Sequence, residues 1–216
     1  PNMLIVTLAL LEGFQSSIRA ELVERTAHAR VVPERGRRLL DAEALASVLH
    51  RDLPDVEQVQ VVRGTCLVRS MTDAVPALVV GRSDVAQVAV DQVLAARTAV
   101  GRGDLLEIVS PRQRLTPMGP LPLRSRVEVA GLMPPEPGHE AGMVRMPLGD
   151  AQRLLWGEPV VEAIELRDAD DPWDVGARAR SALAGTGAAV RVEGLESLHR
   201  PLLLALALER VMIFLA

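Results

Sequence analysis

The side chains that most often perform acid–base or metal chemistry are scattered in this sequence. The four histidines lie far apart along the chain: His28, His50, His139 and His199. A histidine and a carboxylate are adjacent at His139–Glu140, but a zinc-binding helix of the His-Glu-x-x-His type needs a second histidine where Met143 stands. The glycines and prolines beside this pair also oppose a helix. The sequence therefore predicts no metal site.

Other short motifs have structural explanations. The tripeptide Arg-Gly-Asp at 102–104 follows Gly101, and this glycine-rich context favours a turn before a strand. The carboxylates Asp168, Asp170 and Asp171 are typical of a charged turn and helix cap rather than of a catalytic pair. The sequence contains no nucleophile-elbow, Walker or dinucleotide-binding motif. We therefore expect no catalytic residues and no cofactor.

One segment indicates recognition rather than catalysis. Residues Leu115–Pro122 read LTPMGPLP, so three prolines and a glycine surround Met118. Each proline fixes its own φ and restrains the residue before it, which predicts a stiff surface turn or loop. Two explanations of the apolar Met118 side chain are open. It folds back onto its own domain, or it contacts a partner.

The composition limits the classes of partner. The chain has 216 residues, enough for one domain or two small ones, and 49% of them are hydrophobic. Aromatic residues make up only 2%, and the net charge is −4, which argues against nucleic-acid binding. The single Cys66 excludes a disulfide framework and fits either a cytosolic or a periplasmic protein. No segment resembles a signal peptide.

Apolar runs occupy the two ends of the sequence, at Met3–Leu11 and Leu202–Ala216. A helix that spans a bilayer needs about 20 apolar residues, so neither run crosses a membrane by itself. One interpretation pairs them as two buried helices in a hairpin. The interpretation that we favour makes each run the membrane-proximal part of a transmembrane helix.

The pattern of apolar residues predicts the elements that must position the proline-rich segment. A helix over residues 15–24 leads into a strand–helix–strand unit at Ala29–Val32, Asp41–Leu49 and Val56–Val62. A second such unit has strands at Val160–Leu166 and Ala188–Val192, with a helix between them that Asp171 and Pro172 open. We expect the two units to form one α+β lobe.

The interior of the chain has a different pattern, with frequent glycine and proline. The predicted strands are Thr65–Arg69, Ala77–Val80, Leu105–Ser110, Ser125–Leu132 and Met143–Met146, and the predicted helices are Asp91–Thr98 and Leu148–Trp156. This pattern predicts a β-rich lobe inserted into the first one. The proline-rich segment lies between two of its strands, where the tip of a hairpin is expected.

Several segments resemble, in order along the chain, the periplasmic domains of one family of membrane proteins. They are Leu8–Ile18 (LALLEGFQSSI), Leu94–Pro111 (LAARTAVGRGDLLEIVSP), Thr116–Gly119 (TPMG), Val127–Gly131, Met146–Leu155 (MPLGDAQRLL) and Leu206–Phe214 (LALERVMIF). The family is the LolC/LolE type of lipoprotein-releasing ABC transporter permease, within the MacB/FtsX-like superfamily. The resemblance covers nearly the whole chain.

The resemblance implies a domain organisation. Residues 1–26 would be the end of a first transmembrane helix with its periplasmic extension, and residues 201–216 the start of a second. Residues 27–62 and 158–200 would form an α+β, porter-like lobe. Residues 63–157 would form an inserted β-rich, sabre-like lobe.

The resemblance also implies a function. Such a transporter releases outer-membrane lipoproteins from the bacterial inner membrane and passes them to a soluble periplasmic carrier, LolA. A hook that enters the carrier would comprise Thr116, Pro117, Met118, Gly119, Pro120, Leu121 and Pro122. A weaker contact pad would comprise Arg124 and Ser125, while Glu107 stands near the position of a family arginine.

The implied partners are a LolA-like carrier, the lipoprotein substrate, a second permease subunit, a cytoplasmic ATPase subunit and the membrane. The domain would face the periplasm and would not hydrolyse ATP itself. One alternative is a MacB/FtsX-like permease domain with another cargo or partner, such as in efflux or in regulation of cell-wall hydrolases. Another is a soluble enzyme with a terminal helical hairpin, which the lack of a polar constellation disfavours.

Overall fold

The computed structural model describes residues 13–14, 16–18, 20–21, 23–24, 26–70, 73–117, 119–135, 142–201 and 208. The described residues between 13 and 24 are helical, as predicted. The apolar run Met3–Leu11 and all of Leu202–Ala216 except Leu208 lie outside the described residues, as do Met118 and the His139–Glu140 pair. Within the described part of the chain, no helix has the length and apolar character needed to cross a membrane.

The chain is a mixed α and β protein that divides into two compact units. The first unit contains residues 1–35, 43–58 and 165–216, and the second contains residues 36–42 and 59–164. The assignment of these parts to porter-like and sabre-like lobes with the predicted boundaries stays a prediction.

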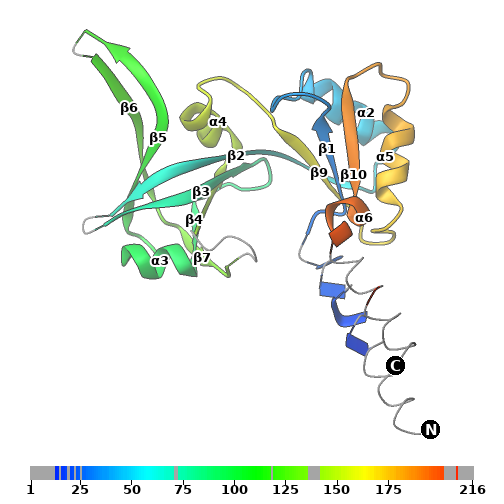
Figure 1. Cartoon of the computed structure of the whole chain (residues 1–216), viewed down its shortest axis with the longest axis horizontal. Coiled ribbons are helices and arrows are strands. Elements are labelled where there is room, and N and C mark those ends of the chain that lie inside the picture. Colours follow the sequence, from blue (N-terminus) through cyan, green and yellow to red (C-terminus); the bar gives the residue numbers. More distant parts are fainter. Residues whose placement is uncertain are drawn as a thin grey trace, which may run out of the picture. The chain divides into compact units, whose positions relative to one another are not determined.

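Three strands organise the first unit, in the order β10 (Val190–Gly194), β1 (Ala29–Pro33) and β9 (Ala163–Arg167). β1 and β10 are antiparallel. The helices are α2 (Ala42–Asp52), α5 (Val175–Leu183) and α6 (Leu195–Leu198) (Figure 1). Gly176 of α5 lies so close to Gly194 of β10 that a Cβ on Gly176 would stand 2.9 Å from the Gly194 Cα. The missing side chain therefore lets the helix pack directly on the strand.

The start of α5 differs from the prediction. Asp171 and Pro172 form part of a turn, and the helix begins at Val175. Asp168 organises this turn, because its Oδ1 accepts hydrogen bonds from the backbone N–H groups of Asp170 and Asp171, and its Oδ2 accepts one from Arg178 at 2.5 Å. The carboxylate thus satisfies turn donors ahead of the helix instead of capping the helix at its first residue.

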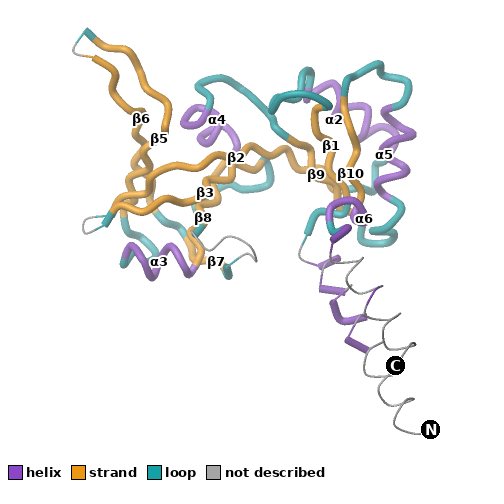
Figure 2. The backbone as a smooth tube through the Cα atoms, in the orientation of Figure 1, coloured by secondary structure: helices purple, strands orange, loops and turns teal. Residues whose placement is uncertain are grey.

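The second unit has a mixed sheet with the order β2 (Glu57–Arg69), β3 (Ala74–Arg82), β8 (Met143–Pro147), β4 (Ala89–Asp91) and β7 (Gly131–Met133). The pairs β3–β8 and β4–β7 are parallel. β5 (Leu105–Thr116) pairs with β2 and with β6 (Gly119–Glu128), and both pairings are antiparallel. The helices are α3 (Gln92–Thr98) and α4 (Leu148–Leu155) (Figure 2).

The predicted strands Val56–Val62 and Thr65–Arg69 are in fact one strand, β2. Gly64 lies inside this strand. A Cβ at Gly64 would stand 2.6 Å from Leu155 Cδ2, so the glycine lets α4 approach the sheet.

The prediction of a single strand at Ser125–Leu132 is wrong, because this segment is divided between two strands, β6 and β7. The backbone changes partner at this point. Val129 N–H donates to the Asp104 carbonyl at 3.0 Å, whereas Ala130 N–H donates to the Val88 carbonyl at 2.9 Å. The short β4, which precedes α3, was not predicted.

The predicted helix at Asp91–Thr98 is confirmed as α3 with Asp91 as its N-cap. The Asp91 Oδ1 accepts a hydrogen bond from Leu94 N–H at 2.8 Å. Leu94 belongs to the main core of the second unit, together with Val68, Leu106, Ile108 and Met146. This core holds the inner end of the β5–β6 hairpin.

Candidate functional site

The proline-rich segment forms the tip of the β5–β6 hairpin. Thr116 pairs with Gly119, so the connection consists of Pro117 and Met118 alone. Thr116 Oγ1 donates to the Gly119 carbonyl at 2.7 Å, and Gly119 has a φ of 110°, which a residue with a side chain rarely adopts. Proline at the second position and glycine at the fourth are the residues that a tight β-turn favours. The tip is therefore specified by its own sequence.

The loop is shorter than the predicted octet, because Pro120 and Pro122 lie within strand β6. In an antiparallel pair, the N–H groups of alternate residues point toward and away from the partner strand. Pro120 and Pro122 are two residues apart on a strand that, among the described residues, pairs only with β5. Proline is tolerated there because the outer edge of the strand needs no donor.

The outer part of the hairpin presents apolar side chains to solvent. Leu115 is 84% exposed and Leu121 is 54% exposed, whereas Leu106 and Ile108 at the base of the same hairpin are fully buried. Figure 1 shows the hairpin projecting from the rest of the second unit. The hairpin is thus anchored by its base and carries exposed leucines near its tip. Of the hook residues, all but Met118 are among the described residues.

The predicted pad residues Arg124 and Ser125 lie on opposite faces of β6. Arg124 is paired with Val109 and Ser125 with Ile108. Successive side chains of a strand point to opposite faces, so Ser125 shares the face of the buried Ile108. The role of the two residues as a pad stays a prediction, with Arg124 as its exposed member.

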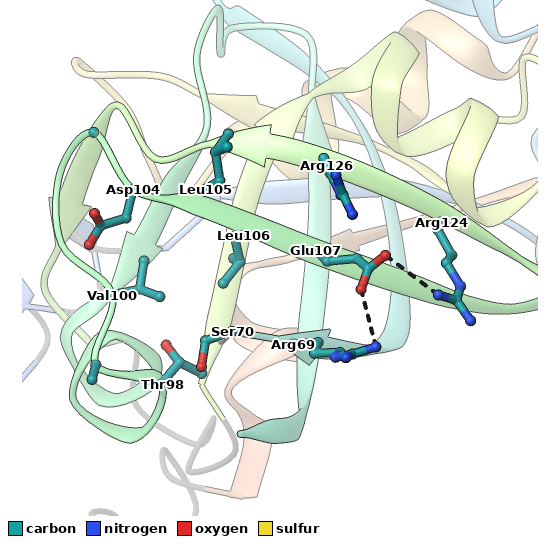
Figure 3. A pocket seen from close by; sticks show the side chains of 12 residues that line it. Arg69, Ser70, Thr98, Val100, Asp104, Leu105, Leu106, Glu107, Arg124 and Arg126 are labelled. Atoms are coloured by element: carbon teal, nitrogen blue, oxygen red, sulfur yellow. Dashed lines mark ion pairs between the residues drawn. The ribbon is translucent and has the colours of Figure 1, made fainter. Parts of the chain in front are cut away.

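Arg124 belongs to a charged cluster on three neighbouring strands. Arg69 of β2 is paired with Glu107 of β5, and Glu107 is paired with Arg126 of β6. The Glu107 carboxylate lies 3.7 Å from Arg69 Nη1 and 3.7 Å from Arg124 Nη1 (Figure 3). Glu107 is the least exposed member of these two ion pairs, so it holds the two guanidinium groups in place on the sheet surface.

The charged cluster borders an open groove of about 860 Å³. Apolar groups from Val100, Leu105 and Leu106 also line it, beside Asp104 and Thr98 (Figure 3). Sequence reasoning missed Arg69 and Arg126. The alternation Arg124-x-Arg126 on one strand could have indicated a shared face. No sequence signal places Arg69 there, since its position depends on the pairing of β2 with β5.

Two groups of side chains that often carry chemistry can be assessed in the described part of the chain. Cys66 is buried, and burial raises the pKa of its thiol to about 11, so it is not a nucleophile at neutral pH. Within the described residues, no three histidine, cysteine or carboxylate side chains are placed to hold a metal ion. The hairpin itself offers an apolar tip and, at its base, a groove with charged and apolar side chains.

The chain is similar to known proteins in sequence and in fold. No known protein family matches in a family scan. The chain is 26% identical over 201 residues to the lipoprotein-releasing system transmembrane protein LolC of Xylella fastidiosa (strain 9a5c). The match covers 81% of this chain and 48% of LolC, so the chain spans about half the length of this curated relative.

Solved structures share the fold. The periplasmic region of MacB from Actinobacillus actinomycetemcomitans superposes with a TM-score of 0.53 at 7% identity, covering 84% of this chain and 94% of that one. The extracellular domain of the ABC-type transporter YknZ from Gram-positive bacteria superposes with a TM-score of 0.51 at 12% identity, covering 79% of this chain and all of that one. In sequence and in fold, the chain resembles the periplasmic domains of LolC/MacB-type ABC transporter permeases.

Proposed function

We propose that this chain is the periplasmic domain of a bacterial inner-membrane ABC transporter permease that releases lipoproteins and hands them to a LolA-like periplasmic carrier. ATP hydrolysis would belong to a separate cytoplasmic subunit, and a second permease subunit would complete the membrane part. The match to LolC over 81% of the chain supports this proposal.

The observation that carries the proposal is the exposed apolar tip of a stiff hairpin. Leu115 and Leu121 lie on opposite faces of the hairpin, because Leu115 is paired with Pro120 and Leu121 with Arg114. Both leucines are exposed beside a turn whose conformation is restricted by Pro117 and Gly119, so a cavity that enclosed the tip would cover both of them. A preorganised tip loses little conformational entropy on binding, so more of the apolar contact energy appears as affinity.

Insertion of the tip into an apolar cavity of the carrier would bury Met118 and its leucine neighbours. Burial of one methionine side chain is worth about 1.5–3 kcal/mol. We therefore expect Met118→Ala to lose about 1–3 kcal/mol of carrier binding, or roughly tenfold or more in affinity. Arg124→Ala should have a smaller effect that weakens with salt, as for a charge at the rim of an interface.

The test is a calorimetric titration of the domain with the LolA-like carrier from the same organism. Leu121→Ala is compared with a matched control, Leu132→Ala, because Leu121 and Leu132 are similarly exposed at 54% and 51%, and Leu132 lies on β7 away from the tip. The proposal requires that the tip variants bind more weakly while the control binds normally. Absence of carrier binding by the unmodified domain would refute it.

A second candidate function is that of a MacB/FtsX-like permease domain with another cargo or partner. The fold likeness to the MacB region, at a TM-score of 0.53, favours it. The two functions differ in the role of the tip. A domain with another cargo would fail to capture a LolA-like carrier and would tolerate Met118→Ala in its own transport assay.

A further inference from the structure

The β5–β6 hairpin contains an irregularity between its base and its tip. Val109 pairs with Arg124, and the next regular pair is Gln113 with Pro122. The three residues Ser110–Arg112 therefore oppose the single residue Leu123. Such a bulge bends a strand and increases its twist, so it sets the direction of whatever lies beyond it.

The bulge has a defined conformation. Ser110 is only 2% exposed, and its Oγ accepts a hydrogen bond from Arg112 N–H at 3.1 Å. Pro111 contributes no N–H and restricts its own φ. The bulge also marks the end of the core, because Ile108 before it is buried whereas Gln113 and Leu115 after it are exposed. We call the outer segment, residues 113–122, the arm.

One side chain of the bulge reaches across to helix α4. A Cβ built on Gly157 would lie 3.0 Å from both Cζ and Nη2 of Arg112, so the guanidinium lies directly over this glycine. Gly157 has a φ of 71° and ends α4, with the N–H groups of Trp156 and Gly157 both donating to the Gln152 carbonyl at 2.8 Å. A side chain at Gly157 would displace the Arg112 guanidinium from this position.

The position of Arg112 is electrostatically favourable. The last carbonyl groups of a helix carry partial negative charge, and a cation beside them is stabilised. The Arg112 guanidinium makes no side-chain hydrogen bond or ion pair with the residues that the structure describes. Arg112 is exposed to solvent, and its guanidinium packs against the end of α4, so this side chain is one contact between the bulge and the body of the unit, beside the buried Ser110.

We propose that Arg112 is a positioning residue, which fixes the direction of the arm by packing its guanidinium over the C-terminal end of α4 at Gly157. For carrier binding, this inference rests on the proposed function of the tip. For the direction of the arm, it rests on the geometry of β5 and α4 alone.

The test measures the direction of the arm by the distance between two spin labels. One label replaces Leu115 on the arm and the other replaces the exposed Arg153 on α4, through Leu115→Cys and Arg153→Cys. Cys66 is buried with a raised thiol pKa, so it resists labelling. The distance distribution is recorded in otherwise unmodified protein and with Arg112→Ala, Arg112→Lys or the control Arg114→Ala.

We expect one narrow distribution in the unmodified protein and with Arg114→Ala. Arg112→Ala should shift or broaden it, and Arg112→Lys should give an intermediate result because lysine keeps the charge but not the planar group. Thermal melting should change little, which separates loss of direction from unfolding. Identical distributions for Arg112→Ala and the unmodified protein would overturn the inference, as would an Arg114→Ala effect equal to that of Arg112→Ala.

A parallel titration with the carrier separates this inference from the proposed function. Loss of a preorganised direction should lower the carrier affinity of Arg112→Ala about three- to tenfold in the unlabelled protein. A changed distance distribution with unchanged carrier binding would support the positioning role and count against the tip as the binding element. An unchanged distribution overturns the inference whatever the affinity.

Discussion

Two leucines on the same hairpin should respond in opposite ways to truncation. Leu106 at the base is fully buried, and Leu115 on the arm is 84% exposed. Leu106→Ala removes packed atoms and leaves a cavity, which costs about 2–5 kcal/mol in a well-packed core. For a protein of this size, that lowers the melting temperature by about 4–20 °C. Leu115→Ala should change the free energy of unfolding by no more than about 0.5 kcal/mol.

Carrier binding should show the reverse order. If the tip enters an apolar cavity, Leu115→Ala forfeits about 1–2 kcal/mol of burial, or roughly five- to thirtyfold in affinity. Leu106→Ala should bind normally at temperatures where it is folded. Denaturant unfolding, thermal melting and titration of both variants give the comparison. Equal destabilisation by the two variants would refute the division of the hairpin into a buried base and a free arm.

Three further predictions follow from packing and ionisation. Burial alone would raise the pKa of Asp168, but backbone hydrogen bonds and Arg178 hold it below its usual value. The stabilisation by this carboxylate is therefore fully present above its unfolded pKa of about 3.9 and is lost as the pH falls through the lower folded pKa. The free energy of unfolding of Asp168→Asn, measured with denaturant, should approach that of the unmodified protein only at acid pH, below the folded pKa. Gly81→Ala should lower stability by about 1–3 kcal/mol, measured by denaturant unfolding, because its Cβ would collide with Ala151 of α4 and stand 2.8 Å from Val62 Cγ1. Cys66 should react with a thiol reagent at pH 8 only after unfolding, since burial raises its pKa to about 11.

The sequence predicted well those helices and strands that short stretches of residues determine by themselves. Asp91 marks the start of α3 because its carboxylate satisfies a helix N–H group three residues on. The strand β1 and the helix α4 were also predicted within one residue of their observed bounds. Such features need only a capping side chain or a run of apolar residues.

Features that depend on partners distant in the sequence were predicted less well. The strand β2 was predicted as two strands, whereas Gly64 continues it and packs against Leu155 of α4. The proline-rich octet was predicted as one loop, because its sequence does not show that the described residues place a strand on one side of β6 alone. The groove could not be predicted for the same reason. Arg69, Glu107 and Arg126 are brought together by the register of three strands that are distant in the sequence.

The prolines of β6 explain how an exposed apolar hairpin can remain available to a partner. A free strand edge with exposed leucines is prone to pair with another chain through its backbone. Pro120 and Pro122 lack the N–H groups that such pairing requires, and they lie on a strand whose one partner in the described part of the chain is β5. Recognition by strand addition is thereby disfavoured along the outer half of β6. For the proposed carrier, we therefore expect binding through the side chains of Leu115, Leu121 and the turn.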